Sequence, residues 1–173
     1  MRRLMLALCA ALTAASPALA APPIRACDVK LNVADQDPAG LNVRDAPDGK
    51  VIGALQAKNA WVQVHVTGDA GGWMRIDGAI LYDDSLPDGQ KSLSPGAGYV
   101  FASKLGVESL DSGAQVLSEP RQGAKLLLTA PLDTDKSPTV EVLGCDGVYI
   151  EVRVGKITGW TAGFCANQYT TCV

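Results

Sequence analysis

Five cysteines and one histidine are the residues of this chain that could carry nucleophilic, redox or metal chemistry. A cysteine nucleophile needs a neighbouring base, and the only imidazole, His65, lies between Val64 and Val66 in a strictly alternating segment. This setting is typical of a solvent-facing histidine on a strand. The chain also lacks the G-x-S-x-G, H-E-x-x-H, Walker and G-x-G-x-x-G motifs. We therefore expect no catalytic residue and no cofactor.

The cysteines are better explained as disulfides than as metal ligands. Cys9 lies in an apolar amino-terminal stretch, and four cysteines follow it: Cys27, Cys145, Cys165 and Cys172. Structural zinc sites usually contain short paired spacings such as C-x-x-C, which this chain lacks. An even number of cysteines in an exported chain indicates a disulfide framework. We predict two disulfides and no metal site.

The pairing of these cysteines stays open among three arrangements. A hairpin turning at Gly155 and Lys156 would bring Cys145 close to Cys165. Cys165 and Cys172 form the local alternative, since they are the closest pair along the chain.

The amino terminus has the pattern of a secretory signal peptide, residues 1–20. Arg2 and Arg3 precede an apolar stretch from 4 to 15, and a small-x-small cleavage site ends at Ala20. The stretch is shorter than the roughly 20 apolar residues of a transmembrane helix, and no later segment is long enough either. We expect a periplasmic or secreted protein without a transmembrane segment.

Charge argues against nucleic acid as a partner. The chain carries a net charge of −3, and removal of residues 1–20, with two arginines and no acids, leaves −5. Nucleic-acid binding needs clustered Lys and Arg, whereas the basic residues here are scattered singly.

Hydrophobic periodicity predicts an all-β fold. The segments 61–66, 140–143 and 149–154 alternate apolar and polar residues, which is typical of strands with one buried face. Gly and Pro clusters separate these segments. No segment after residue 20 keeps a helical period for a dozen residues, and at most one helical turn is expected near 102–105.

Residues 40–55 carry the most specific pattern. The strand Leu41-Asn-Val-Arg44 is followed by the turn Ala46-Pro-Asp-Gly49 and a second apolar strand from Val51 to Leu55. This order resembles the opening of a bacterial SH3-like (SH3b) domain. The resemblance implies a small five-stranded β-barrel that binds peptides or cell-wall components.

The second half of the chain repeats the order of the first. Residues 114–128 align with 41–55, and the three later strands of each copy also align. We expect two tandem SH3-like barrels, residues 21–106 and 107–173. The first carries a loop insertion near 77–97, and the second lacks the Asn-Val-Arg core.

The resemblance implies a non-catalytic exported module that recognises a peptide or cell-wall component, such as a peptidoglycan peptide. The alternative is a structural or assembly subunit that binds another envelope protein. The candidate ligand contacts are Trp61, Tyr99 and Arg44. Arg44 has an alternative role, in which it forms an ion pair with a neighbouring acid instead of contacting a ligand. Trp73 and Trp160 are expected to pack the core.

Overall fold

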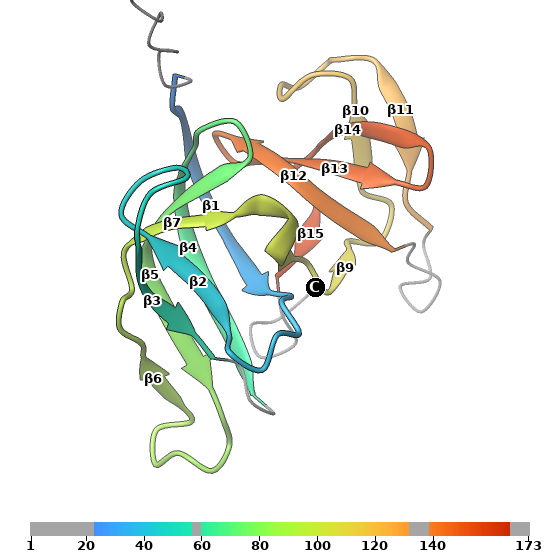
Figure 1. Cartoon of the computed structure of the whole chain (residues 1–173). Coiled ribbons are helices and arrows are strands. Elements are labelled where there is room, and N and C mark those ends of the chain that lie inside the picture. Colours follow the sequence, from blue (N-terminus) through green and yellow to red (C-terminus); the bar gives the residue numbers. More distant parts are fainter. Residues whose placement is uncertain (1–22, 57–59, 132–138, 167–173) are drawn as a thin grey trace, which may run out of the picture.

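Antiparallel strands make up nearly all of the regular secondary structure in the computed structural model, which describes residues 23–56, 60–131 and 139–166 (Figure 1). The strands are β1 (Arg25–Val33), β2 (Leu41–Arg44), β3 (Val51–Leu55), β4 (Trp61–Asp69), β5 (Trp73–Tyr82), β6 (Gln90–Ser92), β7 (Gly98–Phe101), β8 (Leu105–Gly106), β9 (Ser109–Leu110), β10 (Gln115–Leu117), β11 (Leu126–Thr129), β12 (Val140–Asp146), β13 (Tyr149–Val154), β14 (Ile157–Thr161) and β15 (Phe164–Cys165). One 3-10 turn, Ala102–Lys104, follows β7. The all-β prediction and the single helical turn are confirmed. The predicted signal peptide, residues 1–20, lies outside the described residues.

The larger sheet has the strand order β3-β2-β7-β5-β4-β1-β8, with β6 added beside β5. Its strand β1 was not predicted, although its side chains alternate: Cys27, Val29 and Leu31 are buried, whereas Asp28 and Lys30 are exposed. β1 pairs with β4 along most of its length and brings the amino-terminal residues into the sheet.

The smaller sheet has the order β11-β10-β14-β13-β12, and β9 pairs with β15 in a separate two-stranded ribbon. The predicted hairpin at Gly155 and Lys156 is confirmed, because Val154 pairs with Ile157 across that turn. The strands β3-β2-β7-β5-β4 of the larger sheet follow the same order as these five. Neither sheet closes into a barrel, since each ends in strands with one hydrogen-bonded neighbour, so the predicted closed barrels are not observed.

The segment 77–97 is not a loop throughout, because the end of β5 and β6 form a strand pair within it. β5 continues through Ala79, Ile80 and Leu81, and β6 pairs with this extension. The Asp, Ser, Gly and Pro residues that suggested a loop are concentrated in the connection around 83–89 and after β6. The apolar residues at the end of β5 therefore predict this part of the segment better than the overall content of Asp, Ser, Gly and Pro does.

One continuous hydrophobic core joins the two sheets. A disulfide between Cys27 of β1 and Cys145 of β12 crosses the junction, and the amide of Asp28 donates a 2.8 Å hydrogen bond to the Gly147 carbonyl. Of the arrangements left open by the sequence, the pairing of Cys145 with Cys165 is therefore not the one observed. Cys165 is itself disulfide-bonded, and the predicted disulfide residue Cys172 lies outside the described residues.

A buried carboxylate lies at the same junction. Asp69, at the end of β4, is fully buried and forms an ion pair with Arg25. Its oxygens also accept hydrogen bonds from the backbone amides of Gly72 (2.9 Å) and Cys145 (3.2 Å). The Arg25 guanidinium in turn lies 5.1 Å from the ring centroid of Trp160, which is buried as predicted. Asp69 thus connects β4 to β1 within the larger sheet and to β12 of the smaller sheet.

Among the described residues, no helix is long and apolar enough to span a membrane.

Candidate functional site

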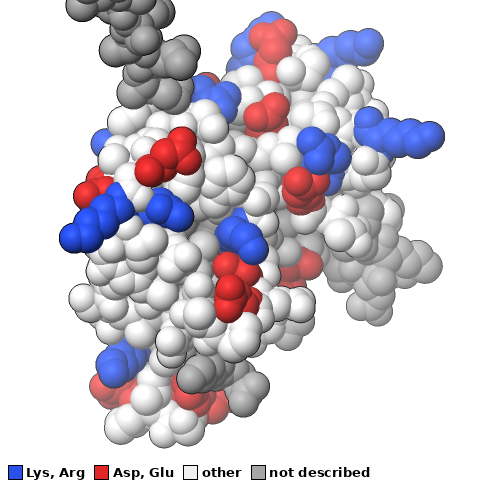
Figure 2. Space-filling model, in the orientation of Figure 1, with Lys and Arg blue, Asp and Glu red and all other residues white. Residues whose placement is uncertain are grey.

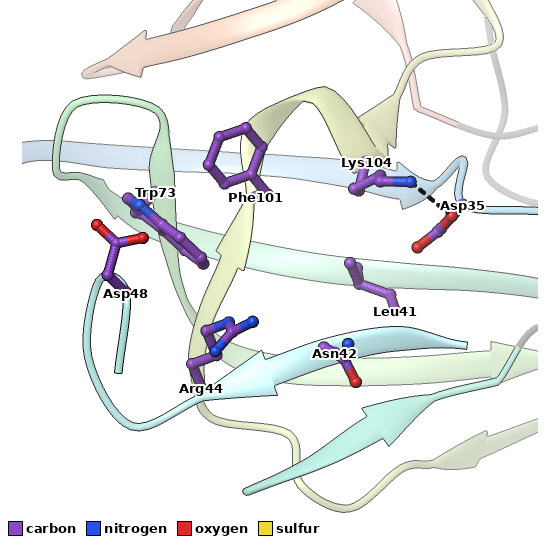
Figure 3. A pocket seen from close by; sticks show the side chains of 8 residues that line it. All are labelled: Asp35, Leu41, Asn42, Arg44, Asp48, Trp73, Phe101 and Lys104. Atoms are coloured by element: carbon purple, nitrogen blue, oxygen red, sulfur yellow. Dashed lines mark hydrogen bonds and ion pairs between the residues drawn. The ribbon is translucent and has the colours of Figure 1, made fainter. Parts of the chain in front are cut away.

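A cavity of about 330 Å³ opens on the larger sheet where β2, β5 and β7 meet (Figure 3). The residues that line it combine aromatic, apolar and charged side chains: Asp35, Leu41, Asn42, Arg44, Asp48, Trp73, Phe101 and Lys104. Leu41 is buried, whereas Asn42 and Arg44 alternate with the buried Val43 and so lie on the outer face of β2. The alternation of β2 therefore places its polar side chains at the cavity.

Two aromatic rings form one wall of the cavity. Trp73 and Phe101 are directly opposite each other in the pairing of β5 with β7, so they share a face of the sheet. Their ring centroids lie 4.8 Å apart in an edge-to-face arrangement. Phe101 is 46% exposed because its neighbours Val100 and Ala102 both point into the core. A partly exposed aromatic pair beside a cavity is typical of a binding surface.

The tight turn before β5 holds Trp73 in place. Gly71 and Gly72 have φ angles of 67° and 90°, in the left-handed region that favours glycine. The Gly72 carbonyl accepts a 2.8 Å hydrogen bond from the amide of Ala102, which directly follows Phe101. The turn thus fixes both aromatic residues relative to each other.

Arg44 forms the opposite wall and interacts with the turn after β2. Its guanidinium lies 5.7 Å from the Trp73 ring centroid, and Nη1 donates a 2.7 Å hydrogen bond to the Gly49 carbonyl. No carboxylate of the described residues forms an ion pair with Arg44, so the ion pair considered from the sequence is not observed. A guanidinium has several N–H donors, and those not used on Gly49 are available to a ligand.

Charges of both signs line the rest of the cavity. Lys104 donates a 3.0 Å hydrogen bond to Asp35, whose side chain is only 10% exposed. Asp48, at the tip of the turn after β2, has a φ of 54°, a conformation that Asp tolerates better than most residues. In Figure 3, Asp48 lies beside Trp73 at one end of the cavity. The pair of Lys104 and Asp35 lies at the other end. The cavity therefore offers cations and carboxylates in equal number.

The structure places the three sequence-predicted contacts differently. Arg44 lines the cavity. Tyr99 is directly opposite Arg44 in the pairing of β2 with β7, so it lies on the same sheet face without lining the cavity. Trp61 pairs with Tyr82 at the far end of β5 from Trp73 and does not contribute to the cavity.

Sequence reasoning missed both aromatic residues of the cavity. Trp73 was assigned to the core, yet it is only partly buried, because Met74 and Ile76 occupy the inward positions of β5. Phe101 was not considered, although its position between Val100 and Ala102 in a short alternating segment is the signal that would have placed it on the surface.

His65 belongs to a second polar cluster, on the opposite half of the sheet. Its Nδ1 lies 2.6 Å from Asp77 and its Nε2 lies 3.0 Å from Asp28, so the ring joins β5 to β1. The hydrogen bond with Asp28 and then that with Asp77 raise the pKa of His65, although partial burial opposes them. The prediction of a solvent-facing strand histidine holds, but this histidine is held between two carboxylates.

Titration of the single histidine tests this arrangement. We expect a midpoint above the ordinary value of 6.5, because the hydrogen bonds with Asp28 and Asp77 outweigh the opposing effect of partial burial on the pKa. Since the folded pKa is raised, the stabilisation is complete below about pH 6.5 and is lost as the pH rises through the folded pKa. The ring proton signals of His65 in an NMR titration measure the midpoint. Asp77→Asn should lower it, and a wild-type midpoint at or below 6.5 would contradict the cluster.

Surface charge and metal chemistry add no competing site. On the face shown in Figure 2, Lys and Arg side chains are interspersed with Asp and Glu over both sheets. Within residues 23–56, 60–131 and 139–166, no group of three or more His, Cys, Asp or Glu side chains is arranged to hold a metal ion.

Comparisons with protein-family models, with curated proteins and with solved structures find no match for this chain. The cavity formed by β2, β5 and β7 is therefore the main structural feature from which a function can be inferred.

Proposed function

We propose that this protein is an exported, non-catalytic binding module that recognises a peptide or a cell-wall component, such as a peptidoglycan peptide, in the cavity between β2, β5 and β7. The observation that carries this proposal is the partly exposed Trp73–Phe101 pair with Arg44 stacked beside it. Such aromatic-lined grooves are a recurring mode of peptide recognition.

The dimensions and chemistry of the cavity favour a peptide. A volume of about 330 Å³ is at the lower end of the range for ligand pockets, which suits one or two residues of an extended chain. The aromatic rings would contact apolar parts of that segment. The guanidinium of Arg44 would donate to a backbone carbonyl or a carboxylate, and Asp48 could accept from an amide or an amine.

The common strand order of the two sheets supports a tandem SH3-like organisation. Strands that align in the internal repeat of the sequence occupy equivalent positions in the two sheets. The second copy has Gln115-Val116-Leu117 where the first has Asn42-Val43-Arg44. Because the repeat lacks the arginine that borders the cavity, we assign binding to the first copy.

Export is supported by the disulfide between Cys27 and Cys145, since disulfides persist mainly in oxidising compartments. It agrees with the signal-peptide pattern of residues 1–20. We therefore place the protein in the periplasm or outside the cell.

One observation favours the alternative role of an assembly subunit that binds another envelope protein. β3 is an edge strand, and its residues Val51 and Ile52 are 40% and 48% exposed. An exposed apolar edge strand can pair with a strand of another protein. In this role the β3 edge, and not the cavity, would carry the contact.

Alanine substitution in the cavity tests the proposal. Phe101→Ala and Arg44→Ala should each weaken binding to soluble peptidoglycan stem peptides by about 1–3 kcal/mol, as for central interface residues. Because Phe101 is half exposed, Phe101→Ala should change the melting temperature little. Isothermal titration calorimetry and thermal unfolding give the two quantities.

Ile52→Ser is the matched control, because it removes an exposed apolar side chain from the edge strand and leaves the cavity intact. It should bind the peptides as the wild type does. If the wild type binds no stem peptide and Ile52→Ser abolishes capture of a protein from envelope extract, the assembly role replaces the binding role.

A further inference from the structure

A second, smaller cavity of about 60 Å³ lies on the face formed by β1, β4 and β5. It is lined by Lys30, Gln63, His65, Gly78 and Ile80. These residues share a face because the strand register pairs His65 with both Lys30 and Gly78, and Gln63 with Ile80. The cavity is separate from the one that contains Arg44 and does not depend on the function proposed for it.

An unpaired donor lines this cavity, and an unpaired acceptor belongs to the residue opposite it on β1. Gln63 is 4% exposed, and its Nε2 has no hydrogen-bond partner within the described part of the chain. Asn32, directly opposite Gln63 in the β1–β4 pairing, is 6% exposed, and its Oδ1 also has no partner there. Burying a polar atom without a hydrogen-bond partner costs free energy. A ligand that bonds to these two atoms would therefore be stabilised by groups that the described residues leave unpaired.

The other walls limit what that partner can be. Both ring nitrogens of His65 are already bonded to Asp28 and Asp77, so the imidazole offers no donor. Ile80, the aliphatic stem of Lys30 and the bare backbone of Gly78 give the remaining wall an apolar character. The positive charges of Lys30 and protonated His65 are balanced by the two carboxylates, which favours a neutral ligand.

From these features we infer that the cavity binds an acetamido group. Its carbonyl oxygen accepts from Gln63 Nε2, its N–H donates to Asn32 Oδ1, and its methyl group contacts Ile80. A secondary amide satisfies one donor and one acceptor with two separate polar atoms and also presents a methyl group. Trp61 and Tyr82 are paired beside Gln63, and the Tyr82 hydroxyl lies 3.5 Å from Gln63 Oε1, so an aromatic surface is available to the rest of the ligand.

An acetamido group can belong to an N-acetylated sugar or to an acetylated peptide, and the probes separate the two. N-acetylglucosamine and N-acetylalanine methylamide are titrated into the full mature protein, with glucosamine and alanine methylamide as the counterparts that lack the acetyl group. The side-chain NH₂ signals of Gln63 and Asn32 in NMR spectra report binding at this cavity. We expect at least one acetylated probe to shift both signals, and its counterpart to shift neither.

Gly78→Val blocks the cavity without removing a polar group. A Cβ at Gly78 would meet only the His65 Cβ, at 3.8 Å, and the backbone there is in an ordinary conformation, so the variant should fold, as circular dichroism can verify. It should weaken binding of the acetylated probe by about tenfold or more, in keeping with the steric selectivity of small pockets. Arg44→Ala, in the other cavity, should leave this binding unchanged.

Binding of the sugar alone assigns the site to a saccharide, and binding of the acetylated peptide alone assigns it to a peptide terminus. Equal shifts from the probes without an acetyl group, no shift from any probe, or undiminished binding to folded Gly78→Val would each overturn the inference. Loss of stem-peptide binding in Arg44→Ala bears only on the first cavity, so the two proposals fail separately.

Discussion

Replacing Cys27 and Cys145 together with alanine is expected to lower the free energy of unfolding by about 5 kcal/mol. The two cysteines are 118 residues apart in the sequence, and a cross-link across so long a segment removes a large part of the conformational entropy of the unfolded chain. Cys145 is fully buried and Cys27 nearly so, so the variant also loses some core packing.

Urea unfolding followed by tryptophan fluorescence measures this effect. The double variant is preferable to either single one, because a lone thiol could exchange with the remaining disulfide. The control is the same comparison in a reductant, where the wild type also lacks the bond and the difference should shrink to the small packing contribution. A difference below about 1 kcal/mol under oxidising conditions would be far short of the loop-entropy value and would contradict a stabilising bond between these residues.

This disulfide shows why the fold was only partly predictable. Strict alternation predicted β4, β12 and β13, and the turn residues predicted the hairpin between β13 and β14. Which strands become neighbours is a long-range property, and the alternation of each strand carries no information on it. The position of β1 beside both β4 and β12 decides that Cys27 reaches Cys145, and for this reason the cysteine pairing stays open when only the sequence is considered.

The missed strand β1 was predictable from its own sequence, because residues 27–33 alternate apolar and polar side chains. What the sequence does not show is the register shift between Ala26 and Val29 in its pairing with β4, and the burial of Asn32. Both depend on the neighbouring strands rather than on the pattern of β1 itself.

The candidate site was predictable in part for a different reason. Arg44 was identified because it belongs to a compact local pattern, the strand and turn from 41 to 49. Trp73 and Phe101 come from strands that meet only in the folded sheet, and a large aromatic residue is usually assigned to the core by size. Met74 and Val100 point into the core, so the neighbouring rings of Trp73 and Phe101 point outward. Predicting this requires knowing which face of each strand is buried.

Replacing Asp69 with alanine is expected to lower the free energy of unfolding by about 2–4 kcal/mol, because two backbone amides lose their acceptor and each unsatisfied buried group costs about 1–3 kcal/mol. The carboxylate is fully buried, and its removal would leave the amides of Gly72 and Cys145 without their acceptor. Arg25 would lose its ion-pair partner, but its side chain is 39% exposed and can be partly hydrated. The loss therefore comes mainly from the buried amides and from the connection that they make between the sheets.

Glu141→Ala is the matched control for Asp69→Ala, since Glu141 also pairs with an arginine, at 2.6 Å from Arg153, but both partners are about half exposed. An exposed ion pair of this kind contributes about 0–1 kcal/mol, so the control should unfold at nearly the wild-type urea concentration. Asn at position 69 retains one acceptor without the charge, and Asp69→Asn should fall between the two. If Asp69→Ala is no less stable than Glu141→Ala, the junction between the sheets depends on the disulfide and the apolar core instead. A graded series from Glu141→Ala through Asp69→Asn to Asp69→Ala would show that burial and hydrogen bonding, rather than ion pairing as such, make this carboxylate important.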